Sequence, residues 1–496
     1  MTTEEVGSDM AVPELVWGRE MSPVDYLMFR GEVDPRMRSS MMSVEILDRV
    51  PDWQRLRDAF DRASRVVLRL RQRVVAPTMP IGTAQWVVDP DFDLDYHLRR
   101  IRSPEPGTLR QVLDVAQPML SAPLDMARPL WEVTLVEGVT ADGGQAALLT
   151  KLSHSIADGL GAVEMDRQLR DFEREADRGP MPPLPVPEDV TSGGLTRRGL
   201  RRLPLSLISG IERLAVGGLG LAGRVARSPT GAASEVAGLV GSVQRILGAP
   251  PVEPSPLLRR RSLNRRLDSL DVPLADLRTS AKAFGCSVND AYIAALCGGL
   301  RLYHERLGVP VDAVPMAIPV SLRTADDPAG GNRWAGVRLA APVGEPDPIV
   351  RMRAVRELML TARSERGINV INAVAPVLAR APAELLSMLS SMGLSNDVQA
   401  SNVPGHAQPT YMAGARILRM CPFGPLPGAA MMVVMFSLAD TCFIGVHYDT
   451  ASVTEPDLFA RCLREGFDEV IALGRPSRSR SAGQTAVAAS TPGAGS

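Results

Sequence analysis

The chain has 496 residues, 45% hydrophobic and 22% charged, which is enough for two globular domains of about 200 residues plus linkers. A formal net charge of -1 gives no reason to expect nucleic acid as a partner. The five cysteines contain no Cys-x-x-Cys pair and the N-terminus is acidic, unlike a signal peptide, so we expect buried free thiols and a cytoplasmic protein.

The first half mixes helical and strand patterns. Residues 1–20 carry little pattern and are predicted to be a flexible N-terminus. A short helix is predicted next, with Ser22 as N-cap, Pro23 at its first position and Asp25 near its positive end. Strands are predicted at 41–47, 84–88, 129–137 and 146–152, and helices at 52–64 and 109–117. This mixture indicates an α/β layer domain over residues 21–175.

A linker is predicted over residues 176–260. It opens with a proline-rich extended stretch at 179–187, and two or three helices are expected between 196 and 248. The apolar run 205–222 has membrane-spanning length, but Glu212 and Arg213 lie inside it, so we do not expect it to cross a bilayer. Two uses stay open, packing against the protein or resting on an anionic membrane surface.

The second half repeats the α/β character over residues 261–474. Strands are predicted at 265–272, 316–323 and 336–342, and helices at 274–284, 287–303, 347–365 and 457–473. Residues 431–448 read as a hairpin turning near Ala439 and Asp440. The tail 475–496, rich in Ser, Arg, Ala and Gly, is predicted to be disordered.

The candidate chemistry lies where the predicted strand 146–152 ends. His154 follows that strand, with Asp158 four residues later and Gly159 next. An imidazole titrates near neutral pH and can act as a general base if its ring is held in place. Asp158 could hold the ring directly or order the loop, and Gly159 allows a tight turn. The alternative is structural: His154 ends a strand, Asp158 caps the next helix and Gly159 eases the turn.

Several separated motifs accompany the His154 motif. They are Ser22-Pro-Val-Asp25, Phe92-Asp-Leu-Asp-Tyr-His-Leu-Arg-Arg, Pro123-Leu-Asp, Arg128-Pro-Leu-Trp-Glu132, Val288-Asn-Asp290, Pro319-Val-Ser-Leu-Arg323, Gly331-Asn332 and Ser401-Asn-Val-Pro-Gly405. With these motifs the chain resembles the bacterial wax ester synthase/diacylglycerol acyltransferase family, and the resemblance covers the chain from residue 22 to the final helix.

The resemblance implies an α/β fold of two tandem chloramphenicol-acetyltransferase-like domains, joined by the partly helical linker and facing each other across a channel. It makes His154 the catalytic histidine, Asp158 the loop-ordering aspartate and Gly159 the motif glycine. Asn289 matches a motif near the site and is our candidate donor to an oxyanion; its alternative role is a helix N-cap. The family usually has a second histidine where this chain has Ser153.

The implied reaction moves a long-chain acyl group from acyl-CoA to diacylglycerol or a long-chain alcohol, with His154 as general base. No bound cofactor is expected, and His97, His304, His406 and His447 show no metal-ligand spacing. The implied partners are acyl-CoA, a lipid alcohol and, at the inner membrane face or lipid droplets, a lipid surface.

Two alternatives remain. One is an acyltransferase with a different alcohol or a carrier-linked substrate, although no carrier serine motif is recognised. The other is an inactive or weakly active protein that binds acyl lipids or membranes, for which Ser153 is the argument.

Overall fold

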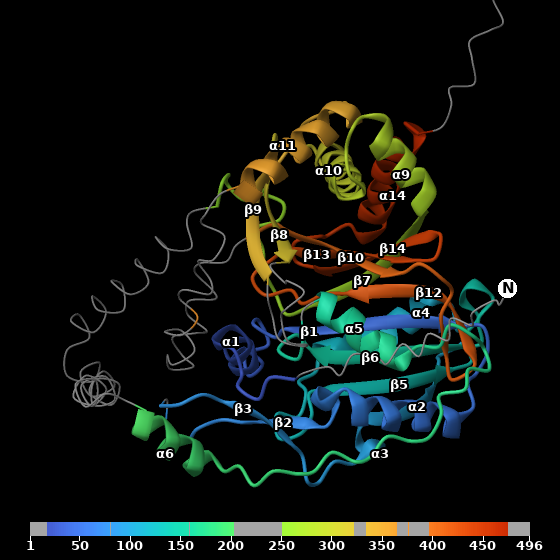
Figure 1. Ribbon diagram of the computed structural model, residues 1–496. Helices are drawn as coiled ribbons and strands as arrows, with labels where there is room; N and C mark the ends of the chain where they lie inside the picture. Colours follow the sequence, from blue (N-terminus) through green and yellow to red (C-terminus); the bar gives the residue numbers. More distant parts are fainter. Residues whose placement is uncertain are drawn as a thin grey trace, which may run out of the picture.

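The computed structural model describes residues 17–79, 81–157, 159–202, 250–321, 334–364, 375 and 396–474. Over these residues the chain forms two six-stranded sheets and one two-stranded sheet. Figure 1 shows the second large sheet stacked above the first. The predicted flexible N-terminus (except residues 17–20), the predicted tail and the apolar run 205–222 lie outside the described residues.

The first sheet has the strand order β11-β12-β1-β6-β5-β4. Its strands are β11 (Tyr411–Met412), β12 (Ala415–Phe423), β1 (Ser40–Leu47), β6 (Ala146–Ser153), β5 (Trp131–Glu137) and β4 (Leu98–Arg102). The predicted strand at 84–88 is β3 (Gln85–Val88), which pairs with β2 (Gln72–Val75) in the separate two-stranded sheet. The sequence patterns predict β1, β3, β5 and β6, whereas β2, β4, β11 and β12 are not predicted.

The second half contributes two strands to the first sheet. β12 lies antiparallel to β1, from Met42 opposite Phe423 to Leu47 opposite Ile417, with a register shift before Leu47. On its other side β1 pairs antiparallel with β6 along its full length. The two halves are therefore joined by backbone hydrogen bonds within one sheet as well as by packing.

The second sheet has the order β7-β14-β13-β10-β8-β9. Its strands are β7 (Arg265–Pro273), β14 (Thr441–Asp449), β13 (Met431–Leu438), β10 (Val398–His406), β8 (Val314–Ser321) and β9 (Trp334–Ala341). The predicted hairpin is confirmed: β13 and β14 pair antiparallel, and Ala439 adopts φ 50° in the turn.

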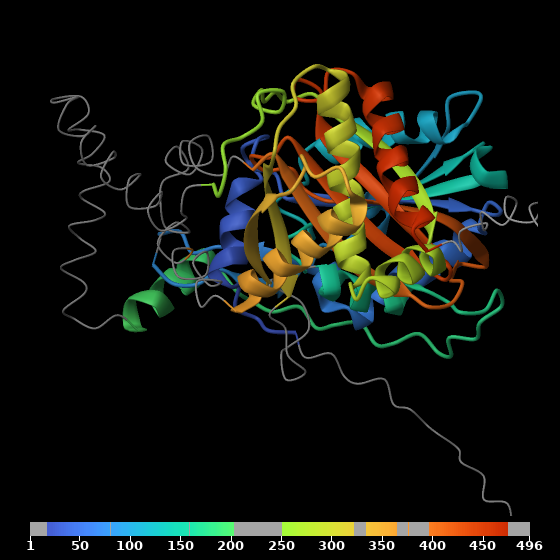
Figure 2. The ribbon, with the colours of Figure 1, turned by 90° about the horizontal axis from the view of Figure 1, so that it is seen from above.

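Helices of the described residues cover the upper face of the second sheet in Figure 1. They are α9 (Leu274–Ala283), α10 (Val288–Arg306), α11 (Pro348–Ser364) and α14 (Pro456–Ala472). Figure 2 shows α10 and α14 side by side across the sheet. Gly299 of α10 lies against Gly466 of α14, and a Cβ added to Gly466 would lie 2.3 Å from the Gly299 nitrogen. Small residues thus permit this close helix contact.

The helices of the first half are α1 (Pro23–Gly31), α2 (Trp53–Val66), α3 (Leu94–His97), α4 (Leu109–Ser121), α5 (Gly159–Leu169) and, from the linker, α6 (Ser192–Arg202). Single turns η1 (Leu68–Leu70) and η2 (Ala141–Gly143) lie between them. The predicted start of α1 is confirmed, because the Ser22 hydroxyl accepts the Asp25 N–H at 3.1 Å. On α2, the predicted apolar face is formed by Leu56 and Phe60, which are buried, and Trp53, which packs beside them.

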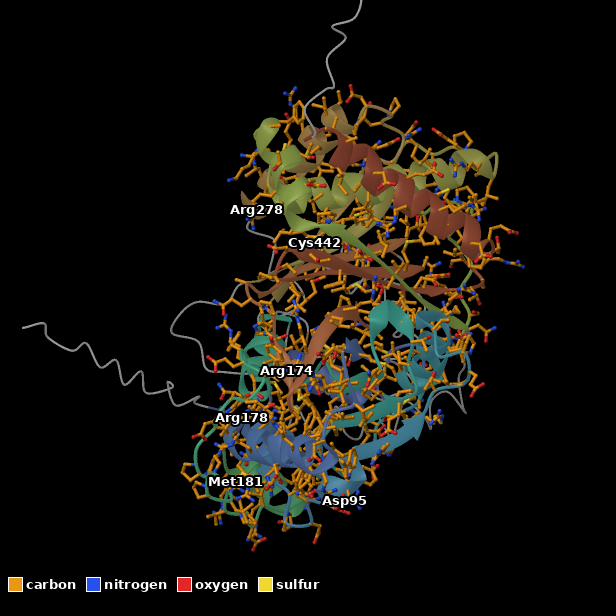
Figure 3. All side chains as sticks on the ribbon, turned by 90° about the vertical axis from the view of Figure 1, so that its right-hand side faces the viewer. Asp95, Arg174, Arg178, Met181, Arg278 and Cys442 are labelled. Atoms are coloured by element: carbon orange, nitrogen blue, oxygen red, sulfur yellow. The ribbon has the colours of Figure 1, made fainter. Side chains whose placement is uncertain are left out.

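All five cysteines lie in the described part of the chain, and they are buried and free. Figure 3 shows Cys442 and Arg278 in the half built on the second sheet, and Arg174 and Arg178 in the half built on the first. Burial raises the pKa of the Cys442 thiol to about 11, so it stays protonated at neutral pH. Among the helices described, none has both the length and the apolar character needed to cross a bilayer.

Candidate active site

His154 lies in the turn that links β6 to α5. The strand ends at Ser153, as predicted, and the turn continues through residues 154–157, which we call the motif turn. The backbone N–H of His154 donates to the Ser39 carbonyl at 3.0 Å, and the Ile156 N–H donates to the Ser153 carbonyl at 3.1 Å. Ile156 and Ala157 are fully buried, while His154 is half-buried. A histidine is thus presented from a turn whose other residues are packed.

The other two motif residues were predicted to complete this turn. Gly159 is the first residue of α5, so the chain turns into a helix directly after the motif. Asp158 lies outside the described residues, and its predicted loop-ordering role stays a prediction.

A buried carboxylate, Glu32, lies beside the motif turn. Its Oε1 accepts hydrogen bonds from the Ser39 N–H at 3.0 Å and the Ser39 hydroxyl at 2.8 Å. The Ser153 hydroxyl donates to the same oxygen at 3.3 Å, and the Ser40 hydroxyl donates to Oε2 at 3.5 Å. The Ser153 and Ser155 hydroxyls are also 3.0 Å apart. We call these five residues the Glu32 cluster; the sequence analysis did not identify it.

The chain places Glu32 here through α1. The Ser22-Pro-Val-Asp25 start fixes where this helix begins, and Glu32 is its C-cap, with its N–H bonded to the Phe29 carbonyl. The carboxylate therefore lies next to the start of β1, whose Ser40 is paired with Ser153 of β6. A motif that the sequence marked only as a landmark thus positions a charged group beside the candidate site.

A second buried charge, Lys151, lies two residues before Ser153 on β6. Its Nζ donates to the Met119 and Ala122 carbonyls at 2.9 and 2.6 Å, at the C-terminal end of α4. A cation at this end of a helix is favourable because the last carbonyls carry partial negative charge. Burial nevertheless lowers the pKa of Lys151 to about 8. Lys151 therefore fastens α4 to the strand that ends at the motif turn.

An ion-pair network links α5, which follows the motif turn, to the second sheet. We define it as Glu45, Asp166, Arg170 and His406. Arg170 Nη2 lies 2.6 Å from both Glu45 Oε1 and Asp166 Oδ1. Asp166 Oδ2 lies 2.9 Å from His406 Nε2, at the end of β10. Although burial alone would raise it, the Arg170 guanidinium and His406 lower the pKa of Asp166 to about 2.

Asn289, the predicted oxyanion donor, is the second residue of α10. The alternative that it caps this helix is wrong, because Ser287 is the N-cap. The Ser287 hydroxyl accepts the Asp290 N–H at 3.2 Å, and Asp290 Oδ2 accepts the Ser287 N–H at 2.8 Å. Asn289 is half-buried, and within the described ranges its side chain forms no hydrogen bond. Its amide is therefore open to another partner.

The remaining histidines have core roles. His97 stacks on Trp131 at 4.4 Å and its Nδ1 contacts the Trp131 carbonyl, while the Trp131 indole N–H donates to Leu70. His304 Nε2 lies 2.7 Å from the Ser255 hydroxyl, and both residues are buried. In the part of the chain that the structure describes, no group of three or more His, Cys, Asp or Glu side chains is placed to hold a metal ion.

A cavity of about 190 Å³ lies between the halves, beside the start of β1. Arg38 and Ser40 line it from the first half, and Arg265 and His447 from the second. Over the described residues Arg38 donates only to backbone carbonyls, so its charge is not neutralised by a carboxylate. Arg265 is paired with Asp449, and burial keeps His447 neutral, so Arg38 is the residue among these four that suits an anionic group such as a phosphate.

Comparison with known families identifies two matching models. Residues 15–292 match the model described as the wax ester synthase/diacylglycerol acyltransferase catalytic domain, and residues 330–470 match the corresponding C-terminal domain. A Mycobacterium tuberculosis protein named as a diacylglycerol O-acyltransferase is 51% identical over 454 residues, covering 92% of each chain. A second protein of that name from the same organism is 28% identical and covers 92% of this chain and 98% of its own.

Solved structures support the fold. A wax ester synthase/diacylglycerol acyltransferase from Marinobacter aquaeolei VT8 matches with a TM-score of 0.62 at 22% identity, over 92% of this chain and all of the other. The first condensation domain of the CDA synthetase matches with a TM-score of 0.56 at 16% identity, over 92% and 97% of the two chains. The predicted two-domain α/β fold is confirmed by these matches.

Proposed function

Because the chain belongs to the wax ester synthase/diacylglycerol acyltransferase family, we propose that it is an O-acyltransferase that moves a long-chain acyl group from acyl-CoA to a lipid alcohol. The acceptors we propose are diacylglycerol, which gives triacylglycerol, and a long-chain alcohol, which gives a wax ester. The single observation that carries this proposal is the placement of His154 in a packed turn at the end of β6.

His154 is the proposed general base. Its imidazole takes the proton from the acceptor hydroxyl as the oxygen attacks the thioester carbonyl. The tetrahedral intermediate collapses with cleavage of the carbon–sulfur bond, and the proton passes from the imidazolium to the CoA sulfur. The products are an ester and CoA thiol, and the histidine returns to its neutral form. General base catalysis of this kind contributes about 10²–10⁴-fold to the rate.

Two neighbours are given supporting roles. We assign Asp158 to ordering the motif turn and Gly159 to the tight entry into α5. We assign the Asn289 amide to donating a hydrogen bond to the oxyanion, which its lack of a side-chain hydrogen bond among the described residues supports.

The serine at position 153, where the family usually has a histidine, is compatible with an active enzyme. Its side chain is fully buried and its hydroxyl is hydrogen-bonded within the Glu32 cluster. A side chain in that position does not contact substrate, so replacing a histidine there leaves the base itself in place. This favours the enzyme over the alternative of a lipid-binding protein without turnover.

Both acceptors are insoluble in water, so we place the reaction at a lipid surface, the inner membrane face or a lipid droplet. The protein would bind this surface peripherally, and acyl-CoA would reach it from the cytoplasm.

The test is ester formation by the purified chain with palmitoyl-CoA and either dioleoylglycerol or hexadecanol in mixed micelles. CoA release is followed with a thiol reagent and the ester is identified by mass spectrometry. We expect an ester with at least one acceptor, and the faster acceptor identifies the physiological branch. Binding of palmitoyl-CoA without any ester from either acceptor would overturn the proposal in favour of lipid binding.

A further inference from the structure

We propose that Glu32 is a positioning residue that fixes the His154 turn for catalysis; this rests on the proposed function of His154. Glu32 is 2% exposed, and within the described ranges it forms no ion pair. Its carboxylate oxygens instead accept hydrogen bonds from one backbone N–H and three serine hydroxyls. A buried carboxylate is stable only when such donors replace water.

The bonds of Glu32 reach His154 from two directions. Ser39, whose N–H and hydroxyl both donate to Oε1, accepts the His154 N–H on its carbonyl at 3.0 Å. Ser153, the residue before His154, donates its hydroxyl to the same oxygen at 3.3 Å. The backbone of the histidine is therefore tied to one carboxylate through Ser153, which precedes it, and through Ser39, which precedes β1. Such double anchoring limits the directions in which the imidazole can point.

Stability alone does not explain a carboxylate at this position. Glu32 is the C-cap of α1, where the partial negative charge of the helix end disfavours an anion. Two cations lie nearby, but both are engaged elsewhere. Arg38 donates its Nε–H to the Glu32 backbone carbonyl at 3.3 Å, and the Lys151 Nζ is bonded to carbonyls of α4. A locally unfavourable charge that is retained beside a catalytic turn points to a role in that turn.

Ser153 connects the Glu32 carboxylate to the motif turn by hydrogen bonds. Its hydroxyl lies between the Glu32 carboxylate and the Ser155 hydroxyl, and it also accepts the Ser155 N–H at 3.3 Å. Serine thus supplies a hydrogen-bond donor at the position where the family pattern has its first histidine. The inference explains how this chain keeps the turn in place with serine there.

The test compares Glu32→Ala, Glu32→Gln, Ser153→Ala and the double variant Glu32→Ala/Ser153→Ala. We expect Glu32→Ala to lower kcat about 10–100-fold, with KM for palmitoyl-CoA within about twofold, because the base is misplaced while binding is kept. Glu32→Gln should retain most activity, since the amide oxygen can accept the three hydrogen bonds that Oε1 accepts from Ser39 and Ser153, and the amide N–H can donate to the Ser40 hydroxyl. The double variant should have a kcat only slightly lower than that of Glu32→Ala alone, because both substitutions remove the same hydrogen bond between Ser153 and Glu32.

A second readout does not depend on turnover. In histidine-labelled protein, the NMR signal of the His154 ring, assigned by its absence in His154→Ala, should shift in Glu32→Ala and in Ser153→Ala. The matched control is Ser280→Ala, which removes a buried hydroxyl bonded to the Ile471 carbonyl at 3.2 Å in the second half. This control should leave both the His154 signal and kcat unchanged.

Three outcomes would overturn the inference: an unchanged His154 signal in folded Glu32→Ala, additive losses in the double variant, or Glu32→Gln as impaired as Glu32→Ala. If the wild type forms no ester, the proposed function fails, and the NMR comparison still decides whether Glu32 positions His154.

Discussion

The halves built on the two large sheets place their buried ion pairs differently. In the first half, the buried network of Glu45, Asp166, Arg170 and His406 joins the end of α5 to β1 and to β10. In the second half, Arg351 pairs with Glu469 between α11 and α14, and Arg265 pairs with Asp449 between β7 and β14, while two other buried groups have pKa values shifted away from their charged forms. Burial lowers the pKa of His447 to about 4 and raises that of Asp397 to about 6.

This difference follows from the position of the motif turn. The first sheet carries the motif turn, and its paired charges tie α5 and the strands beside the turn into fixed positions. The second half supplies β11, β12 and the end of β10 to that arrangement. Breaking a buried ion pair leaves an uncompensated charge, whereas a buried group in its neutral form avoids the desolvation cost of a charge.

The largest effect on stability is expected when Arg170 is removed from the buried network of the first half. In Arg170→Met, Glu45 is left fully buried without its cation and Asp166 keeps only His406, so we expect a loss of about 3–5 kcal/mol in the free energy of unfolding. Urea denaturation followed by tryptophan fluorescence measures it. The matched control is Arg174→Met on the same segment, whose pair with Asp48 is more exposed. Equal losses in both variants would show that the network is no more than a surface ion pair.

His447 tests the buried groups of the second half whose pKa values are shifted away from the charged form. Its pKa in the folded chain, about 4, is below the unfolded value near 6.5, so the unfolded chain binds the extra proton between these pH values. Stability from this group is therefore present above pH 6.5 and is lost as the pH falls toward 4. From pH 7 to pH 5 the loss should be about 2 kcal/mol.

His447→Gln isolates this term, because glutamine can still donate to the Gly424 carbonyl that His447 contacts at 2.9 Å. The difference in unfolding free energy between wild type and variant should change by that amount between the two pH values. Asp397, whose raised pKa gives the opposite slope, is present in both proteins and cancels. A pH-independent difference would contradict the assignment of His447 as a buried neutral group.

The smallest expected effect concerns Ser255. Its hydroxyl is hydrogen-bonded to His304 Nε2 at 2.7 Å, in a buried pair that has the atoms of a nucleophile and a base but is sealed from substrate. Ser255→Ala should cost about 1–2 kcal/mol of unfolding free energy and leave kcat unchanged. A loss of kcat at full folding would mean that the second half takes part in the chemistry through this pair.

The sequence predicts the local elements well, because their signals are local. The Ser22 cap, the apolar face of α2 and the turn at Ala439 each depend on a few neighbouring residues. β12 and β4 were missed. β4 reads Leu-Arg-Arg-Ile-Arg, without an apolar alternation, and β12 is defined by its pairing with β1, which lies far away in the sequence.

The candidate site was predictable in part for the same reason. His154 at the end of β6 follows from the strand pattern and the motif spacing. The position of Glu32 beside the site does not follow from these patterns. Glu32 is 121 residues from Ser153 in the sequence, and the two side chains come into contact only through the placement of α1 and β1 in the fold. Likewise, nothing local in the sequence links Asp166 to His406, which are 240 residues apart. Glu32 is the C-cap of α1, so the Ser22-Pro-Val-Asp25 motif at the start of that helix was the available signal for it.

The central claim is that the first sheet presents a catalytic base. The most direct measurement is the rate of ester formation by His154→Ala beside wild type, with palmitoyl-CoA and the preferred acceptor, together with the unfolding temperature of both proteins. We predict that His154→Ala loses about 10²–10⁴-fold in kcat and unfolds at the same temperature as wild type. An active His154→Ala, folded and forming ester at the wild-type rate, would contradict the account.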